Sequence, residues 1–570
     1  MAEHASSSFD PPYRLEADEV PGFTTPEWAK HAVWYQIMVD RFRRSANAPW
    51  RPHVRDWRQA WDEPSPWEAV DPRGKYEGWI WDRQLGGDLE GIREAFPYLR
   101  DLGVNALYLL PVFQAESPHK YNATNYLHID ERYGVGAPYT DTESAEDLLA
   151  PDTWRFDAND RGFLAFIRDA KREGFRVILD GVFNHVGTRH PAFRDVRERG
   201  PASRFADWFE VESWEPFQYR GWFGHGSLPQ FAKDEEHGLA SDSLRRHLFE
   251  VTRRWMDPDG DGDPSDGIDG WRLDVPNEVP IAFWREWRSL VKSINPEAYL
   301  TGEIWTPAQP WLQGDAFDAV MNYEFATPVV AWLFDRRYRI RAGEFDRRMA
   351  EVRRRHPSEA TYVMQNLLDS HDTDRAVSMA RNPDRVYNKL NRVQDVPTYD
   401  GSKPGPEEYQ RLRLAALIQM TYVGAPMIWY GTEVGMWGAN DPHNRRPMLW
   451  PELEPFGDAP DNVIMPELLD WYRRAIALRN AHPALRTGSF RTVLADDERD
   501  VWAFVREGSG EELLVVVNAA HTIQRVPLSI ELGGGWTPVF GDPPAGATEG
   551  FPDVVLGPLT GRVWHRGEVR

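Results

Sequence analysis

Two kinds of apolar segment alternate through the first four-fifths of the chain, and this alternation limits the fold more than any other feature. Apolar residues recur at helical spacing over 89–99, behind a candidate N-cap at Asp88, and a continuous apolar run follows at 104–110. The same unit then repeats along the chain. Helices and strands that alternate in this way are typical of an α/β protein with a parallel sheet.

About eight of the apolar runs have the length of strands, and eight parallel strands close a (β/α)8 barrel. The alternative is a doubly wound open sheet, which needs a glycine-rich phosphate-binding turn after an early strand. The sequence contains no such turn, so we predict the barrel. The predicted strands are 33–39, 104–110, 175–179, 268–275, 298–304, 316–321, 362–368 and 425–430.

Two regions do not follow the alternating pattern. A polar and aromatic stretch after the third predicted strand is too long for an ordinary connection and predicts an inserted domain. From about Gly488 the pattern changes to strand-like runs between glycine and proline turns, which predicts a C-terminal antiparallel β-sandwich. The predicted units are an N-terminal extension (1–29), the first part of the barrel (30–185), the inserted domain (186–241), the second part of the barrel (242–486) and the sandwich (487–570).

Composition argues against several classes of function. Lys and Arg number 66 against 89 Asp and Glu, and 66 − 89 gives a net charge of −23, which disfavours binding to nucleic acid or to an anionic membrane. The absence of cysteine excludes disulfides, thiolate metal sites and cysteine nucleophiles. The N-terminus shows no secretory pattern, and the longest uncharged run, 414–432, is broken at 424–426, so we expect a cytoplasmic protein without a membrane span.

Three carboxylates follow predicted strands, at the positions where the strand ends of a barrel converge. They are Asp274, Glu303 and Asp372. One such acid alone is more simply a solvated loop residue or a helix N-cap, but three at corresponding positions indicate a shared site. Two carboxyls can hydrolyse a sugar acetal, one as nucleophile and one as proton donor, and a third would balance the oxocarbenium-like charge. Arg272, two residues before Asp274, points the same way in a strand and would hold that carboxylate ionised.

Four ordered segments resemble the signature regions of the α-amylase family of glycoside hydrolases. They are DGVFNH (180–185), GWRLD (270–274), GEIW (302–305) and LDSHD (368–372), each after a predicted strand. The resemblance covers roughly residues 30–570. It implies a catalytic barrel, an inserted domain after the third strand and a C-terminal sandwich, which is the layout that the periodicity predicts.

The resemblance also implies a role for each matched residue. Asp274 would be the nucleophile, Glu303 the general acid/base and Asp372 the stabiliser of the transition state. The other matched residues would bind or support the sugar: His185 and His371 at its hydroxyls, Tyr121 stacked under its ring, Asp180 beside Arg272, Asp441 and Arg445 at the next glucose toward the non-reducing end, and Trp305 on the leaving side.

Within this family the chain is similar to the cyclomaltodextrinase, neopullulanase and maltogenic amylase branch. Segments 274–278, 368–373 and 441–445 carry the similarity. Three features depart from the branch: there is no room before the strand at 33–39 for its usual first sandwich domain, Asn122 replaces its aspartate, and the inserted-domain motif fits none of its specificity classes.

We therefore expect a retaining hydrolase of α-1,4-glucosidic bonds in maltooligosaccharides, cyclodextrins or related α-glucans, acting through a covalent glucosyl-aspartate. A 4-α-glucanotransferase-like transglycosylase would use the same site and is an alternative. A more remote alternative is a non-catalytic carbohydrate-binding or transporter-associated barrel, although such chains tend to lose the acids that are present here. We expect an α-glucan oligosaccharide as the partner, no nucleic acid, no membrane and no organic cofactor; the sequence leaves monomer and homo-oligomer open.

One loop alternates acids with small residues, as calcium-binding loops do. Its candidate ligands for a structural Ca²⁺ are Asp257, Asp259, Asp261 and Asp263. Ile268 occupies the position at which such loops have a bidentate acid. A flexible acidic connection before the fourth strand is therefore an equal alternative.

Overall fold

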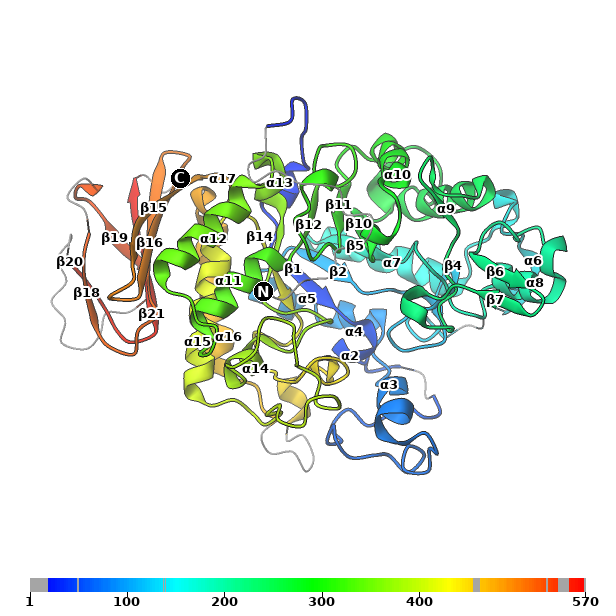
Figure 1. Ribbon diagram of the computed structural model, residues 1–570, viewed down its shortest axis with the longest axis horizontal. Coiled ribbons are helices and arrows are strands. Elements are labelled where there is room, and N and C mark those ends of the chain that lie inside the picture. Colours follow the sequence, from blue (N-terminus) through cyan, green and yellow to red (C-terminus); the bar gives the residue numbers. More distant parts are fainter. Residues whose placement is uncertain are drawn as a thin grey trace.

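The computed structural model describes residues 19–48, 51–136, 138, 140–454, 462–528, 532–541 and 553–567. Residues 1–18 of the predicted N-terminal extension lie outside this part. In Figure 1 the C-terminal sheets lie at one end of the molecule, the barrel lies in the middle, and the segment inserted after the third barrel strand lies at the opposite end.

Eight parallel strands form a closed barrel, as predicted, in the order β1-β14-β13-β12-β11-β10-β5-β2. Their residues are buried on both faces, because one face fills the barrel and the other packs under helices, and only Arg176 at the start of β5 is exposed. This burial explains the continuous apolar runs of the sequence. The strands are β1 (Trp34–Ile37), β2 (Ala106–Leu109), β5 (Arg176–Gly181), β10 (Gly270–Leu273), β11 (Tyr299–Gly302), β12 (Ala319–Asn322), β13 (Gln365–Leu367) and β14 (Ala425–Trp429).

Amphipathic helices connect the strands and cover the barrel. In α7, for example, Phe163, Phe166 and Ile167 lie on the inward stripe and are fully buried. The helices of this layer are α4 (Leu89–Glu94), α5 (Phe96–Leu102), α7 (Ala158–Arg172), α9 (Asp242–Met256), α10 (Ile281–Ile294), α11 (Tyr323–Leu333), α12 (Ala342–Arg354), α13 (Ser358–Val363), α14 (Ala376–Arg381), α15 (Pro406–Thr421), α16 (Pro466–Ala481) and α17 (Pro483–Thr487).

Several element boundaries differ from the sequence prediction, and two examples show the physical reason. The apolar stripe over 89–99 is two helices, α4 and α5, that meet at Ala95, because Pro97 lacks the N–H that a continuous helix would need there. The predicted strand 362–368 is shorter, since its first residues belong to α13, which ends at Val363. In both cases the apolar pattern is correct and the backbone geometry is decided by neighbouring residues.

Further short elements emerge from the barrel. The inserted segment between β5 and α9 contains one helix and two small hairpins. A hairpin follows β2, and a helical excursion lies between β1 and β2. These elements are α1 (Glu27–Lys30), α2 (Val39–Phe42), α3 (Ile80–Asp82), β3 (Phe113–Ala115), β4 (Ala123–Ile129), α6 (Thr140–Ala145), α8 (Pro191–Arg199), β6 (Val211–Trp214), β7 (Phe217–Tyr219), β8 (Lys233–Asp234) and β9 (Gly238–Leu239).

The C-terminal region consists of a five-stranded and a two-stranded antiparallel sheet. Successive side chains of its strand β16 point to opposite faces, so Val501 and Ala503 belong to a second core, whereas Trp502 and Phe504 pack into the main core. The larger sheet is therefore buried on both sides. The strands are β15 (Ser489–Asp496), β16 (Val501–Gly508), β17 (Glu511–Asn518), β18 (Gln524–Pro527), β19 (Thr537–Phe540), β20 (Asp553–Leu556) and β21 (Thr560–Gly567).

A search of the described helices finds none with both the length and the apolar character that crossing a lipid bilayer requires.

Candidate active site

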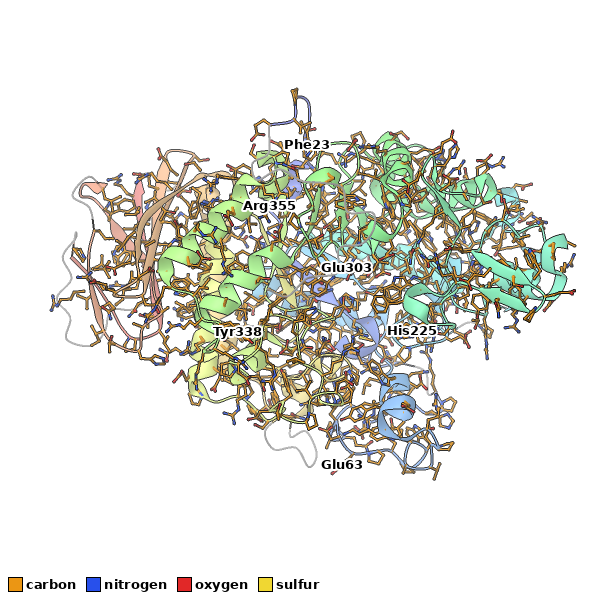
Figure 2. The ribbon with its side chains drawn as sticks, in the orientation of Figure 1. Phe23, Glu63, His225, Glu303, Tyr338 and Arg355 are labelled. Atoms are coloured by element: carbon orange, nitrogen blue, oxygen red, sulfur yellow. The ribbon has the colours of Figure 1, made fainter. Side chains whose placement is uncertain are left out.

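The three predicted carboxylates lie at the ends of barrel strands. Asp274 follows β10 directly, Glu303 follows β11 directly, and Asp372 lies in the loop after β13. Because the strands are parallel, their carboxyl ends lie on the same side of the barrel, and we call this opening the barrel mouth. Glu303, labelled in Figure 2, lies near the middle of the molecule in this view.

The guanidinium of Arg272 joins three carboxylates. Its Nη1 lies 2.8 and 3.0 Å from the two carboxylate oxygens of Asp180 and 3.0 Å from Oδ1 of Asp274, and its Nη2 lies 2.9 Å from Oε2 of Glu303. The side chain of Arg272 is fully buried. Asp274 and Glu303 therefore face the same cation rather than separate cavities, as cleavage of one bond between them requires.

Strand register explains why Asp180 joins this group. Arg272 on β10 is opposite Asp180 on the neighbouring strand β5. On the next strand, β2, Tyr108 donates a hydrogen bond of 2.6 Å to Oδ2 of Asp180. Sequence reasoning missed Tyr108, because a place inside an apolar run does not distinguish it from a structural strand residue.

Asp372 belongs to a second group of charges, around Arg445. Nη2 of Arg445 lies 3.3 Å from its Oδ1, and Nη1 of Arg445 lies 3.1 Å from Oδ2 of Asp441. The side chain of Asp372 is 29% exposed, against 9% for Asp274 and 7% for Glu303. Asp372 is thus the acid most accessible from solvent.

His371 connects the two groups. Its Nε2 lies 2.6 Å from the hydroxyl of Tyr121 and 3.1 Å from Oδ2 of Asp372, and the Tyr121 hydroxyl also donates to Asp180 over 2.9 Å. The rings of Tyr121 and His371 are stacked with 5.5 Å between their centroids. Gln36, which sequence reasoning missed, lies 3.0 Å from Nδ1 of His371 and fixes that ring from inside the barrel.

The other two aromatic groups of the prediction lie against partners that sequence reasoning missed. The ring of His185 stacks on Trp222 of the inserted segment, with 5.2 Å between centroids. Trp305 donates a hydrogen bond of 3.0 Å from Nε1 to Oε1 of Glu303 and stacks on Tyr323, with 3.4 Å between centroids. Trp305 therefore orients Glu303.

Backbone strain lies directly beside the acids. Val275 has φ 37° and ψ 50°, a left-handed conformation that a β-branched residue rarely adopts. In this conformation the N–H of Val275 donates to Oε2 of Glu303 over 3.2 Å. The strained backbone thus directs the N–H of Val275 at the carboxylate of Glu303. Backbone strain of this kind is concentrated at functional sites.

Burial shifts the pKa values of the ionisable side chains at the barrel mouth. Burial and the charge of Glu303 raise the pKa of Asp274 well above its usual range, and the same two causes raise the pKa of Asp372 to about 7. Arg272 lowers the pKa of both acids, but burial outweighs it, contrary to the expectation that Arg272 keeps Asp274 ionised in its usual range. Burial lowers the pKa of His185 to about 3 and that of His371 well below its usual range, so both rings are neutral at pH 7 and can donate and accept hydrogen bonds.

The acidic loop forms a different cluster from the predicted one. Carboxylate oxygens of Asp257, Asp259 and Asp266 lie within 4.8 Å of one another. Asp261 and Asp263 do not join this group; each accepts a hydrogen bond from a backbone N–H two residues later, at 2.7 and 3.0 Å. The cluster thus shares Asp257 and Asp259 with the predicted ligand set and adds Asp266, which the prediction did not name.

Comparisons with known proteins identify the family of the chain. The sequence matches the family described as alpha amylase, catalytic domain, over residues 36–143 and 156–488. Neopullulanase 2 from Thermoactinomyces vulgaris is 37% identical over 515 residues, covering 90% of this chain and 74% of that relative. The intracellular maltogenic amylase from Bacillus subtilis strain 168 is 32% identical, covering 91% of this chain and 73% of that relative. The solved structure of the cyclic α-maltosyl-(1→6)-maltose hydrolase from Arthrobacter globiformis, in complex with cyclic α-maltosyl-(1→6)-maltose, has a TM-score of 0.71 and 29% identity, covering 95% of this chain and all of that one.

Proposed function

The chain belongs to the α-amylase family of glycosidases, and from this premise and the geometry of the barrel mouth we propose that it hydrolyses α-1,4-glucosidic bonds with retention. The observation that carries the proposal is the convergence of Asp274 and Glu303 on Arg272. Retaining glycosidases need two carboxyls on the two sides of one bond, close enough for a covalent intermediate.

In the first step a carboxylate oxygen of Asp274 bonds to the anomeric carbon, the glycosidic C–O bond breaks, and Glu303 protonates the leaving oxygen. In the second step Glu303 takes a proton from water, the water oxygen bonds to the anomeric carbon, and the bond to Asp274 breaks. The first step requires a proton on Glu303 and an ionised Asp274. The carboxylate of Asp372 would stabilise the positive charge while the sugar is oxocarbenium-like, and Arg272 would orient the carboxylate of Asp274.

The surrounding residues would hold the glucose unit at the cleavage point. In this proposal Tyr121 lies under the sugar ring, and His185 and His371 hydrogen-bond its hydroxyls as neutral imidazoles. Asp441 and Arg445 would contact the next glucose toward the non-reducing end. The distance of 3.1 Å between Nη1 of Arg445 and Oδ2 of Asp441 supports a joint role.

Trapping of the covalent intermediate tests the mechanism. α-Maltosyl fluoride needs no proton on its leaving group, so Glu303→Gln would form the intermediate and hydrolyse it slowly. Mass spectrometry of this variant is expected to find one maltosyl group on the peptide that contains Asp274. The double variant Glu303→Gln/Asp274→Asn is the matched control and is expected to remain unlabelled; a label on another residue would refute the assignment.

For the substrates we propose maltooligosaccharides and cyclodextrins, with hydrolysis favoured over transfer. A cyclic α-glucan is the ligand of the Arthrobacter globiformis hydrolase, and hydrolases are named among the relatives. Incubation with maltotriose, β-cyclodextrin, pullulan and starch in parallel, followed by sizing of the products, tests this. Products longer than maltotriose in the first incubation would instead support transglycosylation.

We also propose that Asp257, Asp259 and Asp266 bind a structural Ca²⁺. Oδ1 of Asp257 and Oδ1 of Asp266 are buried without a hydrogen-bond partner, as ligands awaiting a cation would be. Hard carboxylate oxygens are the donors that Ca²⁺ prefers. The ion would neutralise mutual repulsion in this loop and takes no part in the proposed reaction.

The proposed location is the cytoplasm. The Bacillus subtilis relative, whose name describes it as intracellular, supports this location. Fractionation of the producing cells, with the activity assayed in each fraction, tests it.

A further inference from the structure

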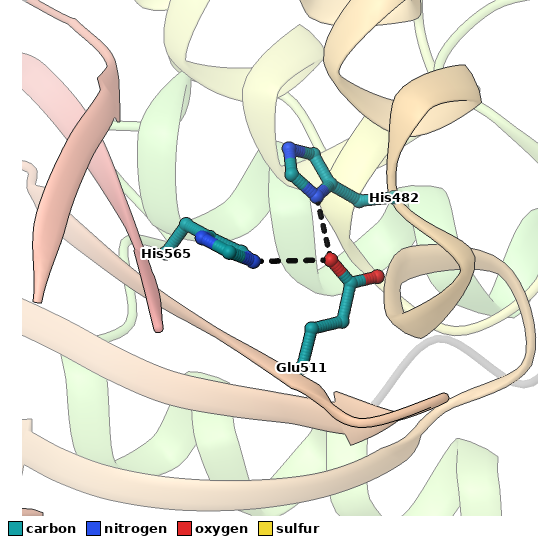
Figure 3. A group of neighbouring side chains, drawn as sticks. All are labelled: His482, Glu511 and His565. Carbon is teal, nitrogen blue, oxygen red and sulfur yellow. Dashed lines mark hydrogen bonds and ion pairs between the residues drawn. The ribbon is translucent and has the colours of Figure 1, made fainter. Parts of the chain in front are cut away.

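Three metal-ligating side chains meet where the barrel helices contact the C-terminal sheet (Figure 3). His482 lies between α16 and α17, Glu511 begins β17, and His565 lies on β21. All three are buried, with 4–6% exposure. Nδ1 of His482 lies 2.7 Å from Oε2 of Glu511, and Nε2 of His565 lies 3.3 Å from the same oxygen.

The fold orients these ligands. His565 is opposite Leu513 in the β17–β21 ladder, so Glu511, two residues from Leu513, is a diagonal neighbour on the same face. The N–H of Ala484 donates to Oε1 of Glu511 over 3.0 Å. Oε2 is thereby turned toward the two imidazoles, as an outer hydrogen bond orients a metal ligand.

One ligand atom of the group has no hydrogen-bond partner. Nε2 of His565 is buried and makes no hydrogen bond, although it lies 3.3 Å from Oε2 of Glu511. A second histidine–carboxylate group, around His128, differs: Nδ1 of His128 lies 2.7 Å from Asp160, and Nε2 lies 2.8 Å from Glu146. Both ring nitrogens of His128 therefore have carboxylate partners, whereas Nε2 of His565 has no hydrogen-bond partner.

We propose that His482, Glu511 and His565 form a site for a divalent transition metal of the Zn²⁺ type, which fastens the C-terminal sheet to the barrel helices. Two imidazoles and one carboxylate suit Zn²⁺, with bonds of about 2.0–2.2 Å and tetrahedral ligand separations of about 3.4 Å. The observed separations are 2.7 Å between His482 and Glu511 and 3.3 Å between His565 and Glu511, so metal binding requires the first pair to move apart by about 0.7 Å and the second by about 0.1 Å. His482 also lines a surface cavity of about 630 Å³, from which an ion could reach the group.

Metal titration of the full-length protein tests this proposal. After removal of metal by EDTA and of EDTA by dialysis, Zn²⁺ binding is measured by calorimetry, Co²⁺ binding by visible absorption, and thermal stability with and without Zn²⁺. We compare the wild type with His482→Gln and His565→Gln. His521→Gln is the matched control, because His521 lies in the same C-terminal region but its side chain is 56% exposed and outside the group.

The wild type and the control are expected to take up one more equivalent of Zn²⁺ than either variant, to show the absorption of four-coordinate Co²⁺, and to gain Tm on addition of Zn²⁺. Equal Zn²⁺ uptake and an equal Tm response in wild type and variants would overturn the proposal. If the variants do not fold, the wild type decides alone: no four-coordinate Co²⁺ absorption and no Tm response to Zn²⁺ would overturn it.

Discussion

The barrel mouth and the loop at 257–266 both bring carboxylates together, but they compensate the charge differently. At the mouth, three carboxylates surround the fully buried guanidinium of Arg272. In the loop, Asp257, Asp259 and Asp266 lie within 4.8 Å of one another, and none forms an ion pair with a Lys, Arg or His among the residues described.

The difference shows what each cluster needs. The mouth carries its own cation, fixed on a barrel strand, which holds its acids in place without any ion from solution and partly offsets the rise in the pKa of Asp274 and Asp372 that burial causes. The loop has only acids, and burial and the neighbouring charges raise the pKa of Asp266. Changes at the mouth should therefore affect turnover strongly, and changes in the loop should affect stability weakly.

The largest effect is expected for Asp274→Asn. Loss of the proposed nucleophile should lower kcat on maltotriose by at least about 10⁴-fold. Folding should be retained, because Arg272 keeps its contacts with Asp180 and Glu303. Activity assays with circular dichroism and Tm check this; a near wild-type rate in a folded variant would exclude Asp274 as the nucleophile.

Substitutions of Arg272 should separate the effect of its positive charge from the effect of its planar geometry. Arg272→Met leaves buried carboxylates without their partner and should lower the free energy of unfolding by about 3–5 kcal/mol. Arg272→Lys keeps the charge but cannot bridge several carboxylates as a planar guanidinium does. Compared with Arg272→Met, it should therefore restore the free energy of unfolding more fully than kcat. Chemical denaturation and kinetics of both variants check this, and equal recovery of both properties would contradict it.

The raised pKa of Asp372, about 7, predicts how its substitution changes with pH. Between its ordinary value near 3.8 and about 7 the folded state binds a proton that the unfolded state has released, so the contribution of Asp372 to stability falls as pH rises through this window. The Tm of Asp372→Asn relative to wild type should therefore rise from pH 4 to about 7 and then level off.

Scanning calorimetry of both proteins across this range measures the difference. Asp152→Asn serves as the control, because Asp152 is exposed and lies outside the strands. Its Tm difference from wild type should not change with pH. A flat difference for Asp372→Asn as well would mean that its carboxyl titrates normally in the folded protein.

The smallest effect is expected in the acidic loop. Saturating Ca²⁺ should raise the Tm by about 1–3 °C, and EGTA should reverse this. Asp266→Asn should abolish the response, whereas Asp263→Asn should keep it, because only Asp266 belongs to the three-residue cluster. Thermal melts with and without Ca²⁺ check this; a response that is lost only in Asp263→Asn would restore the ligand set predicted from sequence.

Much of the site follows from the sequence because its residues follow apolar strands of a barrel. Asp274 and Glu303 each come directly after a strand, and the parallel strands bring them to one opening. The roles assigned to them remain predictions. Tyr108 and Gln36 could not be chosen in this way, because many inward-facing polar residues of strands are structural, and only the distances to Asp180 and His371 single these two out.

The sequence by itself determined the barrel, the inserted segment and the positions of the three acids, because periodicity and strand ends are properties of consecutive residues. Only the tertiary structure decided which residues meet across elements: Asp180 with Arg272, Asp266 with Asp257, and His482 with Glu511 and His565. These contacts depend on strand register and on the packing of distant segments. Neither is encoded at a fixed spacing along the chain, since a neighbour across a ladder can lie about ninety residues away, as Asp180 and Arg272 do.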